Sequence, residues 1–336
     1  MRITAAKDWK GARMAKLPRE LRPTPPTIRS RIVLEIAAEL VAMKDQPNDQ
    51  AKILLRPQGA SEWQLSLFGS STVEGLHEVV ARKSDLAIVN PASLLALAVS
   101  GKGSYFRSPQ PVRPIAVVPS RDSCLFAVRA DLGLTSIEEI GRNRVPLRLA
   151  VRGQRDHWLH PMLDDIVRAA GFTLDDLHAW GGEVRIEGHI PRLGGPKFEA
   201  MARGEIDAIF DESVTTWAND ATPAGMTVLQ MSEATVATLE AMGYCRDTLA
   251  KTQFPTLPGD VLTIDFSGWP IIVREDAPDD FVTRVCTAME ARKHLIPWQE
   301  EGPLPIERMC RNCPDTRLTV PLHPAAERFW RQCGYD

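Results

Sequence analysis

Apolar residues along this chain recur at two spacings, and stretches of one spacing alternate with stretches of the other. Residues 27–44 follow Pro25-Pro26 and repeat apolar positions at the spacing of one helix face. Shorter runs rich in Val, Ile and Leu, bounded by Gly, Pro or Asp, predict strands between such helices. This alternation is typical of βα units, so the sequence predicts an α/β fold built on mostly parallel sheets flanked by helices.

The order of these patterns predicts two lobes. The polar turn Ser120-Arg121-Asp122 separates two extended runs, 111–119 and 123–129, and we place the passage between lobes there. The predicted lobe 1 strands are 52–56 and 85–89, with helices at 72–83 and up to 99; the predicted lobe 2 strands are 147–151, 184–186, 206–210 and 227–230, with helices from 135 and at 159–170, 196–203 and 232–242. An extended run at 261–273 and helices at 278–293 and 324–332 then return to lobe 1. We therefore expect residues 1–120 in lobe 1, 121–260 in lobe 2 and 261–336 back in lobe 1.

The amino-acid composition indicates which kinds of molecule the protein can bind. The chain has 336 residues, 44% of them hydrophobic and 25% charged, and a formal net charge of -3. This length exceeds what one core usually organises, which supports two lobes. Lys and Arg are scattered rather than clustered, so we expect no nucleic-acid partner.

The amino-terminal segment lacks the apolar stretch of roughly 7 to 15 residues that a secretory signal needs. Other apolar runs are far shorter than the roughly 20 residues that span a bilayer, so we expect no membrane insertion. The expected compartment is the cytoplasm if Met1 is the natural start, and the periplasm if a leader has been removed.

Motifs for common cofactors are missing from the sequence. Cys310 and Cys313 form a lone CxxC with no second pair, so free thiols or a loop disulfide are better interpretations than a zinc site. No nucleotide-binding glycine loop, GxSxG or HExxH pattern occurs. We expect no cofactor.

Five stretches together carry a resemblance to a known family. They are 84–89 (SDLAIV), 130–140 (ADLGLTSIEEI), 201–210 (MARGEIDAIF), 263–270 (TIDFSGWP) and 320–330 (VPLHPAAERFW) with Gly334-Tyr335. Their order resembles the TAXI family of solute receptors, the extracytoplasmic binding subunits of tripartite (TRAP) transporters. The resemblance covers roughly residues 30 to 336. It departs from the family at 153–158, where a bulky polar stretch replaces a small Gly/Ser-rich turn.

The resemblance implies the type II periplasmic-binding-protein fold, with a ligand cleft between two α/β lobes, and transporter membrane subunits as partners. Such clefts lie at the carboxyl ends of strands, where the amino-terminal ends of helices favour anions. A small organic anion, with a carboxylate as first candidate, is therefore the expected ligand.

Candidate ligand-binding residues of lobe 1 follow its strands. Ser70, Ser71 and Thr72 lie between strand and helix, where hydroxyls and backbone N–H groups could meet a carboxylate. Ser71 with Glu74 also fits a capping box that needs no ligand. Asn90 follows strand 85–89, although Asn before Pro is also a common turn.

In lobe 2 we single out Arg155 as a bidentate carboxylate partner and Trp158 as a flat apolar wall. An exposed Arg and a core Trp at a helix start are the alternatives. Asp211 and Trp217 follow strand 206–210, where Asp211 could accept hydrogen bonds from a ligand or cap the next helix.

The histidines leave a second function open. His157 and His160 lie one helical turn apart, and His189 with Asp211 could complete a metal site, although spacing alone is weak evidence. With Glu212, these residues would suit a cytoplasmic decarboxylase, another lyase or a metal-assisted enzyme on the same fold. The sequence favours a non-catalytic solute receptor that closes around its ligand, with the enzyme as the alternative.

Overall fold

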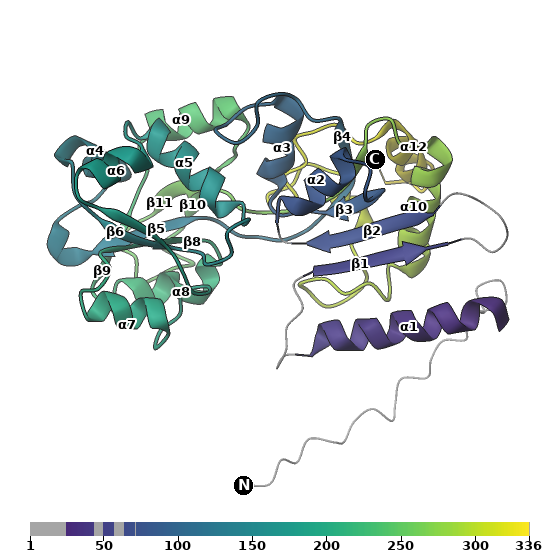
Figure 1. Cartoon of the computed structure of the whole chain (residues 1–336), viewed down its shortest axis with the longest axis horizontal. Coiled ribbons are helices and arrows are strands. Elements are labelled where there is room, and N and C mark those ends of the chain that lie inside the picture. Colours follow the sequence, from purple (N-terminus) through teal and green to yellow (C-terminus); the bar gives the residue numbers. More distant parts are fainter. Residues whose placement is uncertain (1–24, 44–49, 57–63, 71, 336) are drawn as a thin grey trace, which may run out of the picture. The chain divides into compact units, whose positions relative to one another are not determined.

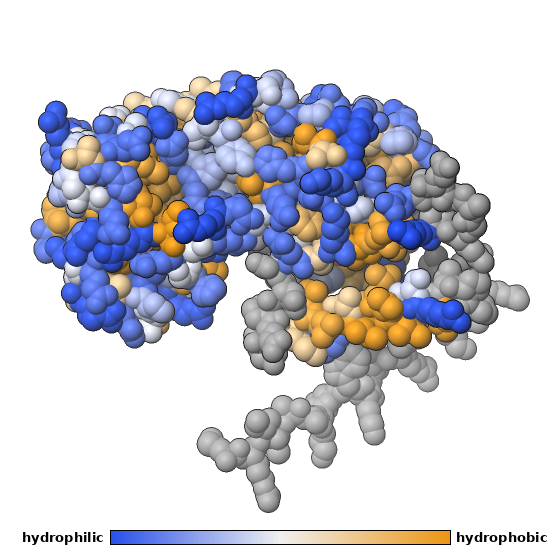
Figure 2. All heavy atoms as spheres, in the orientation of Figure 1, coloured by the Kyte–Doolittle hydropathy of each residue, from blue (hydrophilic) through white to orange (hydrophobic). Residues whose placement is uncertain are grey.

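A computed structural model describes residues 25–43, 50–56, 64–70 and 72–335. The chain divides into two compact units, 1–49 and 50–336. The first contains helix α1 (Pro25–Ala42), which confirms the helix predicted at 27–44. Its apolar side chains, including Ile32, Val33 and Ile36, are exposed and form the orange band along α1 in Figure 2. Within the described residues, no helix has both the length and the apolar character needed to cross a membrane.

The unit 50–336 contains two five-stranded sheets (Figure 1). Lobe 1 is the sheet with strand order β1-β2-β3-β12-β4. Its strands are β1 (Gln50–Leu55), β2 (Leu65–Ser70), β3 (Leu86–Ile88), β12 (Trp269–Arg274) and β4 (Val112–Val118). Side chains on neighbouring positions of β12 enter different cores: Ile272 packs with helices α2 (Glu74–Val80) and α3 (Ala92–Ser100), whereas Ile271 packs with α10 (Asp279–Arg292), α11 (Ile306–Met309) and α12 (Pro324–Gln332). Helices therefore cover both faces of this sheet.

Lobe 2 is the sheet with strand order β7-β6-β8-β5-β9. Its strands are β7 (Glu183–Ile186), β6 (Arg148–Val151), β8 (Ala208–Asp211), β5 (Leu125–Arg129) and β9 (Met226–Leu229). Phe210 of β8 faces α4 (Ile137–Asn143), α5 (Leu159–Ala169), α6 (Leu174–Ala179) and α9 (Glu233–Met242), and its neighbour Ile209 faces α7 (Pro196–Ala202) and α8 (Val214–Ala221). A hairpin of β10 (Arg246–Leu249) and β11 (Val261–Ile264) precedes the return to lobe 1.

The predicted α/β fold with two lobes is confirmed, with one correction. The sheets are mixed, because only the pairs β2/β3, β6/β7 and β6/β8 are parallel within the described strands. β12 enters lobe 1 from lobe 2 between β3 and β4, and it runs antiparallel to both. β5 enters lobe 2 from β4 and runs antiparallel to β8 and β9. β5 and β12, the strands that follow the two crossings between the lobes, are antiparallel to their neighbours. The local sequence pattern does not reveal the direction of a strand. The lobe boundaries at 120 and 260 stay a prediction.

Short polar motifs fix where several helices begin. Ser136 and Glu139 form a capping box at α4, one residue after the predicted start. Thr173 and Asp176 form another at α6, where the Asp176 N–H donates to Thr173 Oγ1 at 3.0 Å. Gly195 leads into α7 with Pro196 at its first position, as the sequence predicts. Such caps satisfy backbone N–H groups that the first helical turn leaves unpaired.

One apolar cluster packs against both sheets, and we call it the shared cluster. It contains Leu94 and Leu97 of α3 in lobe 1 together with Met162 and Ile166 of α5 in lobe 2, all fully buried. Apolar burial contributes about 25 cal/mol per Å² removed from water, so separating the lobes would expose a costly surface. The lobes are therefore joined by side-chain packing as well as by the chain.

Buried carboxylates tie together the two segments that cross between the lobes. Asp265, which follows β11, accepts hydrogen bonds from Ser267 N at 3.0 Å and from Arg121 Nη1 at 3.1 Å. Thr263 Oγ1 donates to the Cys124 carbonyl at 2.7 Å, and Cys124 N donates to the Ile264 carbonyl at 3.0 Å. The outgoing and returning segments thus run side by side.

We expect Leu97→Ala to destabilise the protein by about 2–5 kcal/mol, because it opens a void in the shared cluster. Fluorescence and circular dichroism should still report one denaturant transition for both lobes, because the cluster belongs to both. The control is Leu193→Ala, since Leu193 is 66% exposed and its loss should leave the midpoint unchanged. Two separate transitions, with only one shifted by Leu97→Ala, would contradict a shared core.

Candidate functional site

Neighbouring strands of lobe 1 end together. β2 and β3 are parallel, with Gly69 opposite Ile88, so Ser70, Thr72 and Asn90 lie at the same edge of the sheet. Ser70 Oγ and Thr72 Oγ1 are 2.8 Å apart, and Thr72 Oγ1 accepts a hydrogen bond from Glu74 N at 3.2 Å. Part of their hydrogen-bonding capacity is thus used within the loop. Ser71, and with it the predicted capping box, lies outside the described residues.

Two polar atoms near this edge have no hydrogen-bond partner in the described part of the protein. They are Asn90 Oδ1 and Ser93 Oγ, both buried. Ser93 lies in the first turn of α3, three residues after Asn90. Buried polar groups are nearly always hydrogen-bonded, because an unpaired one costs about 1–3 kcal/mol.

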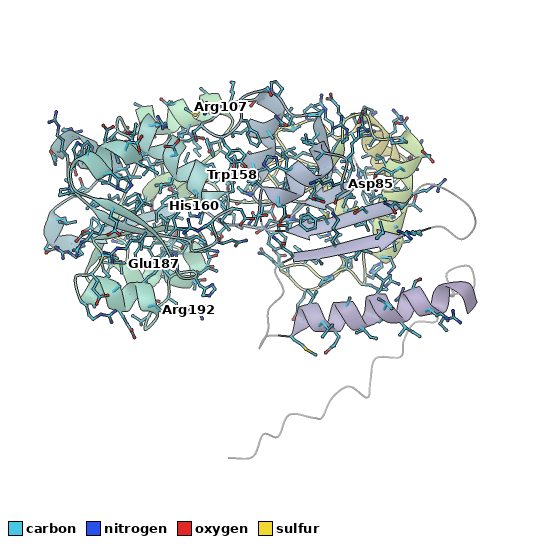
Figure 3. All side chains as sticks on the ribbon, viewed as in Figure 1. Asp85, Arg107, Trp158, His160, Glu187 and Arg192 are labelled. Carbon is cyan, nitrogen blue, oxygen red and sulfur yellow. The ribbon has the colours of Figure 1, made fainter. Side chains whose placement is uncertain are left out.

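The residues just before α5 in lobe 2 contact this same edge of the lobe 1 sheet. Thr72 and His157 form an isolated antiparallel bridge, and the His157 ring stacks on Phe266 with centroids 5.9 Å apart. Trp158, the next residue, is labelled in Figure 3. It is fully buried, and its ring stacks on that of Phe106 with centroids 5.7 Å apart. Its indole Nε1 has no hydrogen-bond partner among the described residues. Unpaired buried atoms therefore lie on both sides of the contact between Thr72 and His157.

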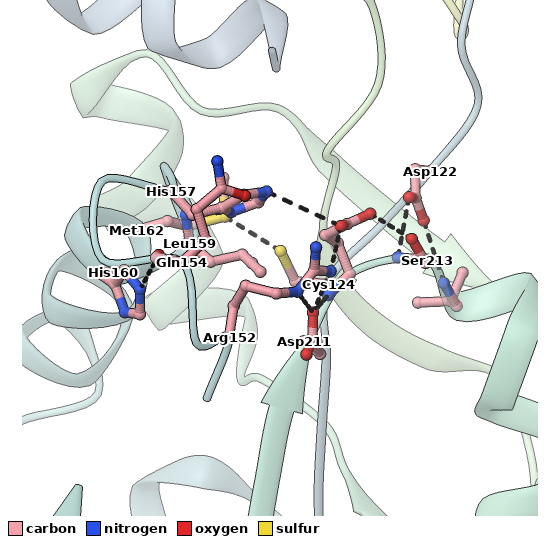
Figure 4. Close-up of polar contacts among 12 residues, drawn as sticks. Asp122, Cys124, Arg152, Gln154, His157, Leu159, His160, Met162, Asp211 and Ser213 are labelled. Carbon is pink, nitrogen blue, oxygen red and sulfur yellow. Dashed lines mark hydrogen bonds and ion pairs between the residues drawn. The ribbon is translucent and has the colours of Figure 1, made fainter. Parts of the chain in front are cut away.

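Charged side chains gather at the strand ends of lobe 2 (Figure 4). Arg152 follows β6, and its Nη2 lies 2.6 Å from Asp211 Oδ1 at the end of β8 and also contacts Glu212. Lys197 of α7 reaches Asp211 Oδ2 at 2.8 Å. Asp211 is fully buried, and the other three are at most 9% exposed. Each buried charge has an opposite partner, as a low-dielectric interior requires.

Asp122, in the outgoing crossing segment, organises the neighbouring loop. Its carboxyl oxygens accept hydrogen bonds from Ser213 N at 2.9 Å and from Val214 N at 3.2 Å. Ser213 has a left-handed backbone with φ of 59°, which a non-glycine residue adopts only when neighbours hold it. Ser213 Oγ donates to Glu212 Oε2 at 2.6 Å. The crossing segment thus positions the acidic end of β8.

Burial and neighbouring charges shift the pKa values of Asp122, Glu212 and His157 in different directions. Burial, together with the hydrogen-bonded Glu212, holds the pKa of Asp122 well above its usual range. Burial opposes ionisation of Glu212 too, but the hydrogen bond with Asp122 and the charge of Arg152 lower its pKa. Burial and then the charge of Arg152 lower the pKa of His157 to about 4. At neutral pH, Glu212 is therefore ionised and His157 neutral.

The remaining predicted residues lie apart from this cluster. Arg155 is exposed. Trp217 is fully buried in the core beneath α7 and α8, and its indole N–H donates to the Glu212 carbonyl at 3.0 Å. Asp211 and Trp158 belong to the site region, whereas Arg155 does not contact them in any described interaction.

The three histidines make separate contacts. His157 Nδ1 accepts a hydrogen bond from Leu159 N at 3.3 Å, His160 Nε2 donates to the Gln154 carbonyl at 2.8 Å, and His189 is exposed. Across the residues that the structure describes, no three His, Cys, Asp or Glu side chains form a group suited to a metal ion. All six cysteines, Cys310 and Cys313 included, are free thiols.

Sequence reasoning missed Arg152, Lys197 and Asp122. Arg152 directly follows β6, just as Asp211 stands at the end of β8. Ligand sites tend to lie at the carboxyl ends of strands, so this rule could have identified Arg152. Lys197 comes from a helix, and Asp122 from the crossing segment, so no local pattern signals them. A groove of about 990 Å³ lies elsewhere, in lobe 1 between the sheet and α10, and apolar residues such as Leu67, Ile271 and Val285 line it.

No protein-family model matches the chain, and no curated protein matches it. Among solved structures it is similar to the periplasmic binding protein BugD, at 12% identity and a TM-score of 0.35, over 66% of this chain and 69% of that one. The tungstate-binding protein TupA of Desulfovibrio alaskensis G20 matches at 11% identity and a TM-score of 0.35, over 84% and 94%. An ancestral arginine-binding protein matches at 12% and 0.31, over 67% and 73%. Such loose likenesses carry no argument about function, and the fold rests on the strand orders above.

We expect Asp211→Ala to destabilise the protein by about 3–5 kcal/mol, because Lys197 and Arg152 would lose a buried counter-charge. Glu205→Ala is the control, since Glu205 pairs with Arg203 at the exposed surface and should change nothing measurable. Urea denaturation of both variants measures the difference. Equal midpoints for the two variants would show that the buried cluster is not held by Asp211.

Stability should fall as the pH drops from about 6.5 to about 4, because the unfolded chain protonates His157 before the folded protein does. The contribution is at most about 3 kcal/mol. His157→Asn should remove it, so the stability difference between wild type and variant should vary with pH in this window. His189→Asn, at an exposed position, is the control. A difference that stays constant with pH would disprove a buried neutral His157.

Proposed function

We propose that this protein is a solute receptor that binds a small organic anion, with a carboxylate as first candidate, where its two lobes meet. The observation that carries the proposal is a set of three neutral, buried polar atoms that have no hydrogen-bond partner among the described residues: Asn90 Oδ1, Ser93 Oγ and Trp158 Nε1. Lobe 1 supplies two of them and lobe 2 the third. A ligand between the lobes would satisfy atoms that are otherwise costly to bury.

The positions of these atoms support one common ligand. Asn90 ends the strand beside β2, and Thr72, after β2, pairs with His157, the neighbour of Trp158. The Trp158 indole N–H can only donate, and the Ser93 hydroxyl can donate or accept. Asn90 Oδ1 accepts, so the ligand we propose carries a carboxylate and also a hydroxyl or N–H donor.

The charges nearby bear on how an anion would bind. Arg152 and Lys197 are already paired with Asp211 and Glu212, so neither offers a free positive charge. Recognition would rest on neutral donors and on the amino-terminal end of the 11-residue helix α5, whose dipole favours anions. Ser70, Thr72, Asp211 and Trp217, with Arg155 at the surface, remain proposed residues of the wider site.

The resemblance of the sequence to the TAXI family supports this function and implies transporter membrane subunits as partners. The proposal places the protein in the periplasm, which cell fractionation can check. The alternative enzyme would use His157, His160, His189 and Asp211, but the rings of His157 and His160 make separate hydrogen bonds and His189 is exposed. We therefore propose binding without catalysis.

The test is a thermal-shift and calorimetry panel of small mono- and dicarboxylates that carry a hydroxyl or amino group, with their amides and alcohols as uncharged controls. At 100 times its Kd, a bound carboxylate should add about 2.7 kcal/mol of stability, whereas its amide should add much less. Trp158→Phe should weaken binding about 10- to 100-fold, because it removes one donor to a charged group.

Trp180→Phe is the matched control, because Trp180 lies at the carboxyl-terminal end of α6, where its ring packs against Phe172. It should bind as the wild type does. If no carboxylate binds, or if both tryptophan variants bind equally well, the proposed site is wrong.

A further inference from the structure

The loop between α3 and β4 of lobe 1 contacts α5 of lobe 2, and we call its residues 101–106 the strap. Tyr105 and Phe106, at its end, lie on Trp158 with ring centroids 5.7 Å away in each case. The Tyr105 ring meets Trp158 edge-on, and the Phe106 ring is stacked on it. The strap therefore covers the one indole N–H that the proposed ligand would use.

A single buried carboxylate holds the strap against lobe 2. Asp165 of α5 is 2% exposed, and its Oδ1 accepts a hydrogen bond from Ser104 N at 2.7 Å. Its Oδ2 accepts from the Tyr244 hydroxyl, also at 2.7 Å. A hydrogen bond to a carboxylate is about twice as strong as a neutral one, and burial excludes competing water.

The backbone of the strap is shaped to reach this carboxylate. Gly103 has φ of 79°, and a Cβ at this position would lie 2.7 Å from Asp165 Oδ2 and 2.6 Å from Leu97 Cδ2. Only glycine lets the loop approach so closely without displacing the carboxylate or the core. Two independent features, the acceptor and the glycine, thus serve the same contact.

Other contacts of the strap are weaker or lie within lobe 1. Lys102 Nζ donates to the Ala241 carbonyl at 2.7 Å, but this bond is exposed to solvent. The Tyr105 hydroxyl lies 2.8 Å from His77 Nε2, which belongs to lobe 1. Asp165 is therefore the buried anchor of the strap in lobe 2.

We infer that Asp165 is a positioning residue that keeps the strap closed over Trp158, so that release of the Ser104 N–H opens a path to the enclosed indole. This gate rests on the proposed function, because it states how a ligand would reach that site. A more open strap exposes the indole N–H to water without unfolding either lobe, as local openings of loops do.

The test follows hydrogen exchange of indole N–H groups by NMR in protein labelled with ¹⁵N-tryptophan, without any ligand. The chain has eight tryptophans, and the Trp158 signal is the one lost in Trp158→Phe. Trp217 and Trp330 are internal references, because their buried N–H groups donate to the Glu212 and Ile115 carbonyls. Each reports opening of its own lobe.

Asp165→Ala should accelerate exchange at Trp158 about tenfold or more relative to both references, as loss of a hydrogen bond to a charged group predicts. Lys102→Ala, the matched control, should leave all three rates unchanged. Gly103→Ala gives a second test with Asp165 intact, and it should accelerate Trp158 in the same selective way.

Unchanged exchange at Trp158 in both Asp165→Ala and Gly103→Ala would overturn the gate. Equal acceleration of Trp158, Trp217 and Trp330 would overturn it too, because Asp165 would then act on overall stability. The readout needs no ligand, so a failed carboxylate panel refutes the proposed function alone. Binding of a carboxylate with unchanged exchange refutes the gate alone.

Discussion

The burial of one apolar cluster between two sheets is the constraint on which the rest of this structure depends. Leu94 and Leu97 of α3 cannot be buried by lobe 1 alone, because Met162 and Ile166 of α5 complete their surroundings. This packing sets the distance between α3 and α5. The strand ends of both lobes, the strap and Trp158 all lie where these two helices begin or end. The position of the candidate site follows from the packing of the core.

The pairing of buried charges in lobe 2 limits which groups of a ligand the site can bind. Arg152 and Lys197 are buried beside Asp211 and Glu212, and removing Asp211 would leave Lys197 without its counter-charge. Burial and the neighbouring Glu212 hold the pKa of Asp122 well above its usual range, which opposes a second negative charge there. The charged groups therefore bind one another and hold the structure around the site in place. The neutral atoms of Asn90, Ser93 and Trp158 are the ones left for a ligand, which favours a small molecule held by directed hydrogen bonds.

Local sequence patterns predicted most helices and most strands, because apolar spacing and capping residues act over a few positions. The helices at 27–44, 159–170 and 232–242 were recognised from spacing alone, and they correspond to α1, α5 and α9. The mixed sheets were missed, because the insertion of β12 between β3 and β4 joins residues about 150 to 190 positions apart. Trp158 and Asn90 were found by the strand-end rule, whereas Lys197, Asp122 and Asp165 act through contacts that only the fold creates.

The central claim is that a small organic ligand completes the hydrogen bonding of buried atoms from both lobes. A high-resolution crystal structure of the protein, purified without added ligand from the cells that produce it naturally, tests this directly. The account predicts electron density of a small organic molecule within hydrogen-bond distance of Trp158 Nε1 and of Asn90 or Ser93. Density showing that all three atoms are bonded to protein groups or to single water molecules would contradict it.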